Sequence, residues 1–358
     1  MRTIDADTRG HARPEFTRAT RKGPWPWKGR VVVADETMVF LPVDGFYMTP
    51  LHAWAGAVGA AVPELRIIVA EPGADPRPLL APASAAFGML TPQLLAAAPG
   101  LRWLQAPAAA PPPAFFFPEL VEHPVVVTNL RGVYRDNLAN HIMAYVLSFA
   151  RALPRYAAVQ ASAQWRRDVD DIGIVDLAAT TMLLIGVGHV GAATAARARA
   201  FGMRVVGVDT FPDRVDADVD ELHHVDELDS LLPRADWVVV TVPHTPVTEG
   251  MMNASRFEAM KETAYLINVG RGETVRLEDL TIALERGMIA GAALDVCEIE
   301  PLPSDHPLWR APNVIITPHV AGFGRDTDAL REALIVDNAH RFVRGEPLRN
   351  VIDKALRY

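Results

Sequence analysis

Residues 181–191 have the sequence TMLLIGVGHVG, in which an apolar run leads directly into three glycines. Residues 181–186 predict a buried strand, and the glycine motif is expected to open a helix over 190–201. In the spacing G-x-G-x-x-G, Gly186 permits a tight turn, Gly188 lets the backbone approach a pyrophosphate, and Gly191 lets helix and strand pack closely. The N–H groups at the helix start face that anion. This context favours a dinucleotide site over a strand–turn–helix without a ligand.

The next predicted strand, residues 205–209, ends in the carboxylate of Asp209, 18 residues beyond Gly191. A carboxylate at that place accepts hydrogen bonds from the adenosine ribose hydroxyls and repels a 2′-phosphate, so it favours NAD over NADP. Arg214 is close in sequence and complicates this preference. A solvated carboxylate at a strand end is the alternative interpretation of Asp209.

Strands alternate with helices on both sides of this motif, which predicts parallel sheets. Before the motif we expect a helix at 51–61, a short helix capped by Thr91, and strands at 31–33, 66–70, 101–105 and 125–128. Residues 106–118 contain five prolines and five alanines and are predicted to be irregular. Further helices are expected at 138–152, 190–201, 276–286 and 327–344, and further strands at 237–242, 264–268, 291–295 and 314–317.

Composition narrows the classes of protein to consider. The 358 residues are enough for two domains, half of them are apolar, and the net charge of −8 argues against a nucleic-acid binder. There is no long uncharged apolar run and no secretory signal, and the single cysteine, Cys297, excludes an intrachain disulfide, so we expect a cytoplasmic protein without a membrane span. Residues 1–29 are basic and rich in proline, which predicts a flexible tail; an arm packing on a partner through Trp25 and Trp27 is the alternative.

Three later segments place polar side chains just after predicted strands. They are Asn268-Val269-Gly270-Arg271-Gly272, the run 295–303 with Asp295 and Glu300, and Thr317-Pro318-His319-Val320-Ala321-Gly322. Ligands and catalytic groups in open parallel sheets lie beyond the carboxyl ends of the strands. We therefore expect Arg271, Glu300 and His319 to meet at one edge of a sheet.

At these residues the chain resembles the D-isomer-specific 2-hydroxyacid dehydrogenase family. The resemblance rests on the glycine motif, Pro243-His244-Thr245-Pro246, the Asn-x-Gly-Arg-Gly segment, Glu300-Pro301-Leu302-Pro303 with His306-Pro307-Leu308-Trp309, and Pro318-His319. It is close over residues 130–322 and looser in the flanks. It implies two doubly wound α/β domains: a Rossmann-type cofactor domain at 131–322, inserted into a smaller flavodoxin-like substrate domain at 30–130 and 323–358. It also implies a homodimer, with helix 138–152 a plausible part of the contact.

The resemblance implies hydride transfer between NAD(H) and a small 2-hydroxy or 2-keto acid, in the direction of a 2-keto acid reductase. Arg271 would hold the substrate, His319 would be the acid–base, and Glu300 would fix the imidazole tautomer. Substrate contacts are expected from Ala108, Ala109, Arg271 and His319. The expected cofactor contacts are Gly186, Gly188, His189, Val190, Gly191, Asp209, Val242, Pro243, His244, Thr248, Val269, Gly270, Arg271, Asp295, His319 and Gly322. No cysteine or histidine spacing predicts a metal site.

The chain departs from the family in the loop Ala106-Pro107-Ala108-Ala109-Ala110-Pro111-Pro112-Pro113, where family members carry a glycine-containing loop that binds the substrate carboxylate. Proline has no N–H, and alanine resists positive φ, so only Ala108–Ala110 offer donors. A non-catalytic NAD-sensing protein therefore stands as the alternative to an enzyme. A formate-dehydrogenase-like protein is disfavoured, because those pair the histidine with Gln rather than Glu. Phe115-Phe116-Phe117 are expected in the core rather than in an apolar pocket.

Overall fold

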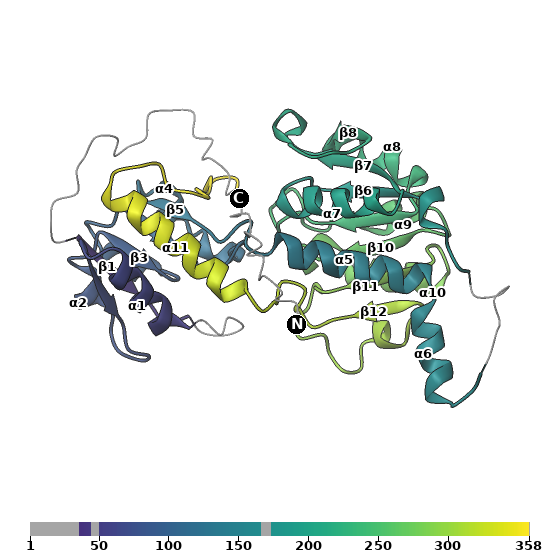
Figure 1. The fold of residues 1–358 in the computed structure, drawn as a ribbon, viewed down its shortest axis with the longest axis horizontal. Helices are drawn as coiled ribbons and strands as arrows, with labels where there is room; N and C mark the ends of the chain where they lie inside the picture. Colours follow the sequence, from purple (N-terminus) through teal and green to yellow (C-terminus); the bar gives the residue numbers. More distant parts are fainter. Residues whose placement is uncertain (1–35, 44–49, 166–172, 358) are drawn as a thin grey trace, which may run out of the picture.

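Two parallel sheets organise the chain in the computed structural model, which describes residues 36–43, 50–165 and 173–357 (Figure 1). The first sheet has the order β2-β1-β3-β4-β5. Its strands are β1 (Glu36–Phe40), β2 (Leu65–Val69), β3 (Ala85–Phe87), β4 (Trp103–Gln105) and β5 (Val126–Thr128). All its strand pairs are parallel, and this order is that of flavodoxin-like folds.

The second sheet has seven strands in the order β12-β11-β10-β9-β6-β7-β8, again with parallel pairs throughout. The chain reverses direction across the sheet beside β6, which is the arrangement of a Rossmann-type fold. The strands are β6 (Thr181–Ile185), β7 (Arg204–Asp209), β8 (Glu221–His224), β9 (Trp237–Val240), β10 (Tyr265–Asn268), β11 (Gly291–Leu294) and β12 (Val314–Ile316).

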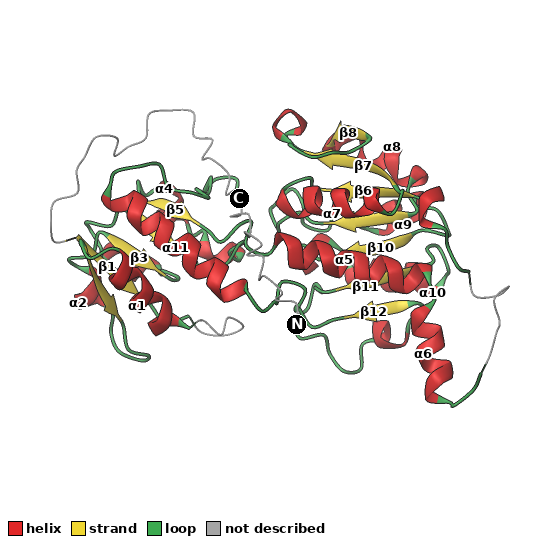
Figure 2. Cartoon of the chain, viewed as in Figure 1, coloured by secondary structure: helices red, strands yellow, loops and turns green. Residues whose placement is uncertain are grey.

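Helices cover both faces of each sheet (Figure 2). Around the first sheet they are α1 (Leu51–Ala61), α2 (Arg77–Leu80), α3 (Pro92–Ala96), α4 (Pro118–Glu122) and α11 (Thr327–Val343). Around the second they are α5 (Arg135–Ala150), α6 (Leu153–Ala161), α7 (His189–Ala200), α8 (Leu228–Leu231), α9 (Ala254–Ala259) and α10 (Leu277–Glu285). The last helix, α11, returns to the first sheet and packs beside α1.

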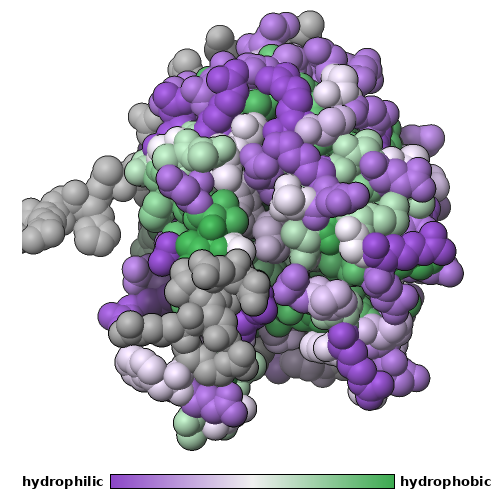
Figure 3. All heavy atoms as spheres, turned by 90° about the vertical axis from the view of Figure 1, so that its right-hand side faces the viewer, coloured by the Kyte–Doolittle hydropathy of each residue, from purple (hydrophilic) through white to green (hydrophobic). Residues whose placement is uncertain are grey.

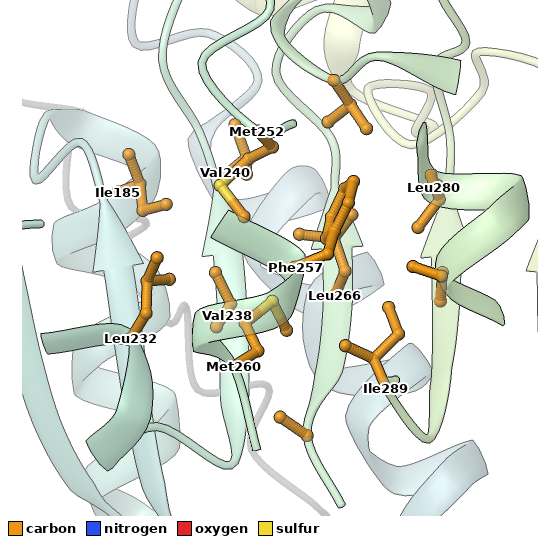
Figure 4. Packing of buried hydrophobic residues seen from close by; sticks show 14 of the residues in the cluster. Ile185, Leu232, Val238, Val240, Met252, Phe257, Met260, Leu266, Leu280 and Ile289 are labelled. Carbon is orange, nitrogen blue, oxygen red and sulfur yellow. The ribbon is translucent and has the colours of Figure 1, made fainter. Parts of the chain in front are cut away.

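Burial on both faces explains the apolar strands of the second sheet, where side chains alternate between two cores. In β9, Val238 and Val240 pack with Phe257 and Leu280 under α8, α9 and α10 (Figure 4). Trp237 and Val239 of the same strand point the other way, into the core under α5 and α7. The first sheet is buried likewise, by α1 and α11 on one face and α2, α3 and α4 on the other. Phe115 and Phe116 lie in the latter core, as predicted.

Several local predictions need correction. The strands β1, β3 and β8 were not predicted: β3 is an alanine-rich segment of three residues, and β8 is a polar strand at the edge of its sheet. Helix α5 begins at Arg135 instead of residue 138. The proline-rich run is not wholly irregular, since Pro113–Phe115 form a 3-10 turn and α4 starts at Pro118, where a proline loses no helical hydrogen bond.

The tail at 1–29 and the strand expected at 31–33 lie outside the described residues. In the described part of the chain, no helix is both long enough and apolar enough to cross a membrane. The end of the molecule formed by the second sheet is covered mostly by hydrophilic residues, with hydrophobic areas between them (Figure 3). The domain boundaries near residues 130 and 323 stay predictions.

Candidate active site

The glycine motif forms a cradle between β6 and α7 that only small residues allow. Gly186 has a φ of +92°, and a Cβ atom at Gly191 would lie 2.3 Å from the Gly186 carbonyl oxygen. A Cβ atom at Gly188, by contrast, would meet no protein atom within 4 Å. The backbone at Gly188 therefore borders open space at the start of a helix, where a pyrophosphate has room and N–H donors. This geometry fits a dinucleotide.

Asp209, at the end of β7, also braces this cradle. One carboxylate oxygen accepts a hydrogen bond from the Val187 N–H at 2.9 Å, and the other accepts one from the Phe211 N–H at 2.9 Å. Each oxygen keeps a further lone pair for a ligand hydroxyl. Asp209 thus links the glycine loop to the strand end at which a ribose is expected.

His319 and Glu300 meet beyond the ends of β12 and β11. The imidazole Nδ1 lies 2.8 Å from Glu300 Oε2, while Oε1 of the same carboxylate accepts a hydrogen bond from the Cys297 N–H at 3.0 Å. Burial opposes ionisation of Glu300, but the hydrogen bond and charge of His319 outweigh it and hold the pKa of this carboxyl below its usual value. Glu300 thus fixes the side of the imidazole that carries Nδ1.

Arg271, after β10, connects the two sheets. Its guanidinium donates one hydrogen bond to the Gly270 carbonyl at 2.7 Å and one to the Ala110 carbonyl at 2.9 Å. The positive charge of Arg271 also contributes to the lowered pKa of Glu300. The structure therefore brings Arg271, Glu300 and His319 together, and adds the loop that carries Ala110 to the same site.

The carbonyl groups of that loop are all engaged in hydrogen bonds with the rest of the chain. The carbonyls of Ala108, Ala109 and Ala110 accept hydrogen bonds from the Leu130 N–H, the Asn129 amide and Arg271, respectively. Within the described part of the chain, the N–H groups of these three alanines donate no hydrogen bond. None of the three has a positive φ, so this loop does not need the glycine that the family carries.

The other predicted cofactor residues line the same edge of the sheet. A Cβ atom at Gly270 would lie 2.6 Å from the Val242 carbonyl oxygen, so these two loops are in close backbone contact. Thr248 donates to the Pro243 carbonyl at 2.7 Å and shapes the turn that holds His244. The His244 ring lies 3.6 Å from both Glu249 and Glu273 carboxylates.

The remaining predicted positions have mainly internal contacts. His189 and Val190 begin α7, and Val269 is buried behind the arginine loop. The carbonyl of Gly322 accepts a hydrogen bond from the Asn137 amide. Asp295 is buried and accepts hydrogen bonds from Thr317, Val320 and Ala321. Its carboxylate is thus engaged in holding the histidine segment.

Residues outside the predicted triad were checked for other chemistry. Burial raises the pKa of the Cys297 thiol to about 11, which favours the packed, unreactive cysteine that the sequence suggested. Among the described residues, no group of three or more His, Cys, Asp or Glu side chains could hold a metal ion.

Sequence reasoning did not assign a function to His141, Tyr145 or Thr317. The sequence does contain a pattern that could have identified them, since His141 and Tyr145 are one helical turn apart and Thr317 follows a predicted strand.

Comparison with known proteins agrees with this geometry. The sequence model of the family described as D-isomer specific 2-hydroxyacid dehydrogenase, NAD binding domain, matches residues 143–321. The chain belongs to the D-isomer-specific 2-hydroxyacid dehydrogenase family. The match spans the glycine cradle as well as Arg271, Glu300 and His319, so the nicotinamide-dinucleotide fold and the clustered side chains lie within the same family domain.

Relatives in this dehydrogenase family cover much of the chain. A glyoxylate reductase of Thermofilum pendens is 34% identical over 241 residues, which cover 66% of this chain and 70% of the relative. A glycerate dehydrogenase of Methylorubrum extorquens is 34% identical over 235 residues, covering 64% and 72%. A family member from Xanthobacter autotrophicus, solved in complex with NADPH and MES, has a TM-score of 0.75 and 30% identity, covering 90% of this chain and all of that one.

Proposed function

We propose that the protein is an NADH-dependent reductase of small 2-keto acids, which it converts to D-2-hydroxy acids. The observation that carries this proposal is the Glu300–His319 pair beside Arg271 and the Ala108–Ala110 loop. An imidazole held by a carboxylate is a proton donor for a carbonyl oxygen, and a guanidinium fork suits a carboxylate. The names of the reductase and dehydrogenase relatives agree with this substrate class.

Each residue has a separate task in the proposed mechanism. The N–H groups of Ala108 to Ala110 and the guanidinium of Arg271 bind the substrate carboxylate and orient the keto group. His319 gives a proton from Nε2 to the carbonyl oxygen as it becomes a hydroxyl. Glu300 accepts a hydrogen bond from Nδ1–H, which fixes the tautomer, and stabilises the imidazolium that forms in the reverse direction. A nicotinamide dinucleotide held at the Gly186–Gly191 cradle would supply the hydride when bound.

The preference for NADH over NADPH depends on Asp209. Its carboxylate stands at the end of β7 and would repel a 2′-phosphate. Arg214, the cation that could counter this repulsion, has its guanidinium 4.4 Å from the centre of the Phe211 ring. The Xanthobacter autotrophicus relative was solved with NADPH, and the Asp209 substitution described in the Discussion tests the preference of this chain.

We further propose a cytoplasmic homodimer in which residues 131–322 bind the dinucleotide and residues 30–130 with 323–358 bind the substrate. The apolar residues Ile142, Val146 and Phe149 of α5 pack into its own chain. A dimer contact through α5 would therefore use the opposite face, which includes the exposed Asn140 and Ala144.

Turnover and binding measurements together test this function. NADH oxidation should be followed with glyoxylate, hydroxypyruvate, pyruvate and bulkier 2-keto acids, using wild-type protein and His319→Ala. We expect turnover of at least one acid, a loss of roughly 10²- to 10⁴-fold in kcat/KM for the variant, and unchanged NADH affinity. Tight NADH binding without turnover of any 2-keto acid would favour the NAD-sensing alternative. An active His319→Ala protein would exclude His319 as the acid–base.

A further inference from the structure

The face of α5 that packs on the second sheet carries two polar side chains, His141 and Tyr145. Both reach the same atom, the hydroxyl oxygen of Thr317 just after β12: His141 Nε2 lies 3.1 Å from it and the Tyr145 hydroxyl 2.5 Å. The two rings are in edge-to-face contact, with centroids 4.6 Å apart. A helix that precedes the whole cofactor sheet in the chain therefore contacts the segment that carries His319.

The direction of these hydrogen bonds follows from the atoms involved. Thr317 Oγ1 also lies 2.5 Å from Asp295 Oδ1. An ionised carboxylate only accepts hydrogen bonds, so the one hydroxyl proton of Thr317 goes to Asp295. Thr317 must then accept from both α5 residues, which requires the His141 proton to be on Nε2. Tyr145 is a stable donor, because burial raises its pKa and the phenol keeps its proton.

Asp295, which the Thr317 hydroxyl orients, also makes hydrogen bonds with the backbone around His319. His319 has a φ of +56°, in the left-handed region that a residue with a Cβ atom rarely adopts. Its N–H donates to the Asp295 carbonyl at 2.8 Å, and the Val320 and Ala321 N–H groups donate to the Asp295 carboxylate at 2.9 Å each. Asp295 is only 3% exposed, so it has little freedom to turn elsewhere. The Asp295 carbonyl thus holds the His319 N–H, and the Asp295 carboxylate holds the two N–H groups that follow it.

We propose that His141 and Tyr145 are positioning residues that hold His319 in its strained, productive conformation through Thr317 and Asp295. Neither residue is required to touch substrate or cofactor for this role. Tyr145 and Asp295 in this chain of hydrogen bonds are buried, and His141 and Thr317 are half-buried. In such a partly desolvated network each hydrogen bond strengthens the next. This inference rests on the proposed function, since it concerns the proposed acid–base.

The sharpest test compares two substitutions at Thr317 that differ in whether they keep the hydroxyl. Thr317→Val removes the hydroxyl and Thr317→Ser keeps it. We expect Thr317→Val to lower kcat for the 2-keto acid by roughly 10- to 100-fold. This is the range typical of losing a residue that orients a metal-binding side chain through a hydrogen bond, which is a comparable task. The NADH dissociation constant should change little, and the pH profile of kcat/KM should shift. Thr317→Ser should restore both kcat and the profile.

Tyr145→Phe gives a second test, with Tyr265→Phe as its matched control. Tyr265 stacks on Trp237 and Phe149, and its hydroxyl has no hydrogen-bond partner among the described residues. We expect Tyr145→Phe to reduce kcat and shift the profile in the same direction as Thr317→Val, and Tyr265→Phe to do neither. Tyr145→Phe is the milder substitution and tests the proposal even if Thr317→Val does not fold.

A readout without turnover separates this proposal from the proposed function. The His319 imidazole should be titrated by NMR in wild type, Thr317→Val and Tyr145→Phe, assigned by its absence from His319→Ala. A displaced titration in both variants supports the positioning role even when no 2-keto acid is reduced. Variants that melt at lower temperature but keep the wild-type titration and pH profile would overturn it, because His141 and Tyr145 would then only stabilise the fold.

Discussion

Glu300 and His319 are held together by a 2.8 Å contact between a carboxylate oxygen and imidazole Nδ1, although they follow different strands. The second oxygen of Glu300 accepts the Cys297 N–H, so the carboxylate is oriented from both sides. The imidazole therefore has its orientation set before any substrate arrives.

Substituting Glu300→Gln should change how stability depends on pH. The pKa of Glu300 is lowered in the folded protein, so its ionised form stabilises the fold above the ordinary value of 4.5, and this contribution is lost as the pH falls through the lowered value. The melting temperature of wild type should exceed that of the variant at neutral pH, and the gap should narrow in acid. Thermal melts across this pH range check it. A gap that widens in acid would contradict the ion pair.

Two substitutions of Arg271 should distinguish the contribution of its positive charge from that of its planar guanidinium group. Arg271→Ala should reduce kcat/KM for 2-keto acids by about 10²- to 10³-fold, because it removes the charged donors of the substrate carboxylate and the tether to Ala110. Arg271→Lys should recover little, since an ammonium cannot span two acceptors in the same plane. Steady-state kinetics check this, with NADH affinity as the control. Full activity of the lysine variant would show that charge alone suffices.

Substitutions at two glycines of the motif should distinguish an effect on cofactor binding from an effect on folding. Gly188→Ala places a methyl group where no protein atom lies within 4 Å, so its melting temperature should stay close to wild type while NADH affinity falls by about tenfold or more. Gly191→Ala forces a Cβ atom to within 2.3 Å of a carbonyl oxygen and should lower both. Melting curves and NADH titrations of the two variants give the comparison. Undiminished NADH affinity in Gly188→Ala would place the pyrophosphate elsewhere.

Cofactor preference should respond to Asp209. Asp209→Ala removes the charge that opposes a 2′-phosphate, so the ratio of kcat/KM for NADH over NADPH should fall by about tenfold. Some loss of stability is expected as well, because the Val187 and Phe211 N–H groups lose their acceptor. Kinetics with both cofactors check the ratio. An unchanged ratio, with a lower melting temperature, would make Asp209 a brace of the glycine loop only.

Sequence reasoning was strongest where one short segment contains its own signal. Helix α1 at Leu51–Ala61 and the Thr91 cap were predicted at their observed places. The strand β6 and the glycine turn after it were also recognised, because an apolar run and special backbone positions are local properties. Strand β3, with only three residues, contains no such local signal and becomes a strand by pairing with β1 and β4.

By itself, the sequence determined that this is an α/β protein with a dinucleotide cradle and with Arg271, Glu300 and His319 just beyond strand ends, because strand periodicity and glycine spacing are encoded locally. Only the tertiary structure decided that the carbonyls of the Ala108–Ala110 loop accept hydrogen bonds from Arg271 and Asn129, so that its N–H groups are the ones left for a ligand. It also decided that His141 and Tyr145 meet Thr317. The contacts of Arg271 and Thr317 join residues more than a hundred positions apart, and that of Asn129 joins two different loops. Sheet order and helix packing, rather than local propensity, place these residues together.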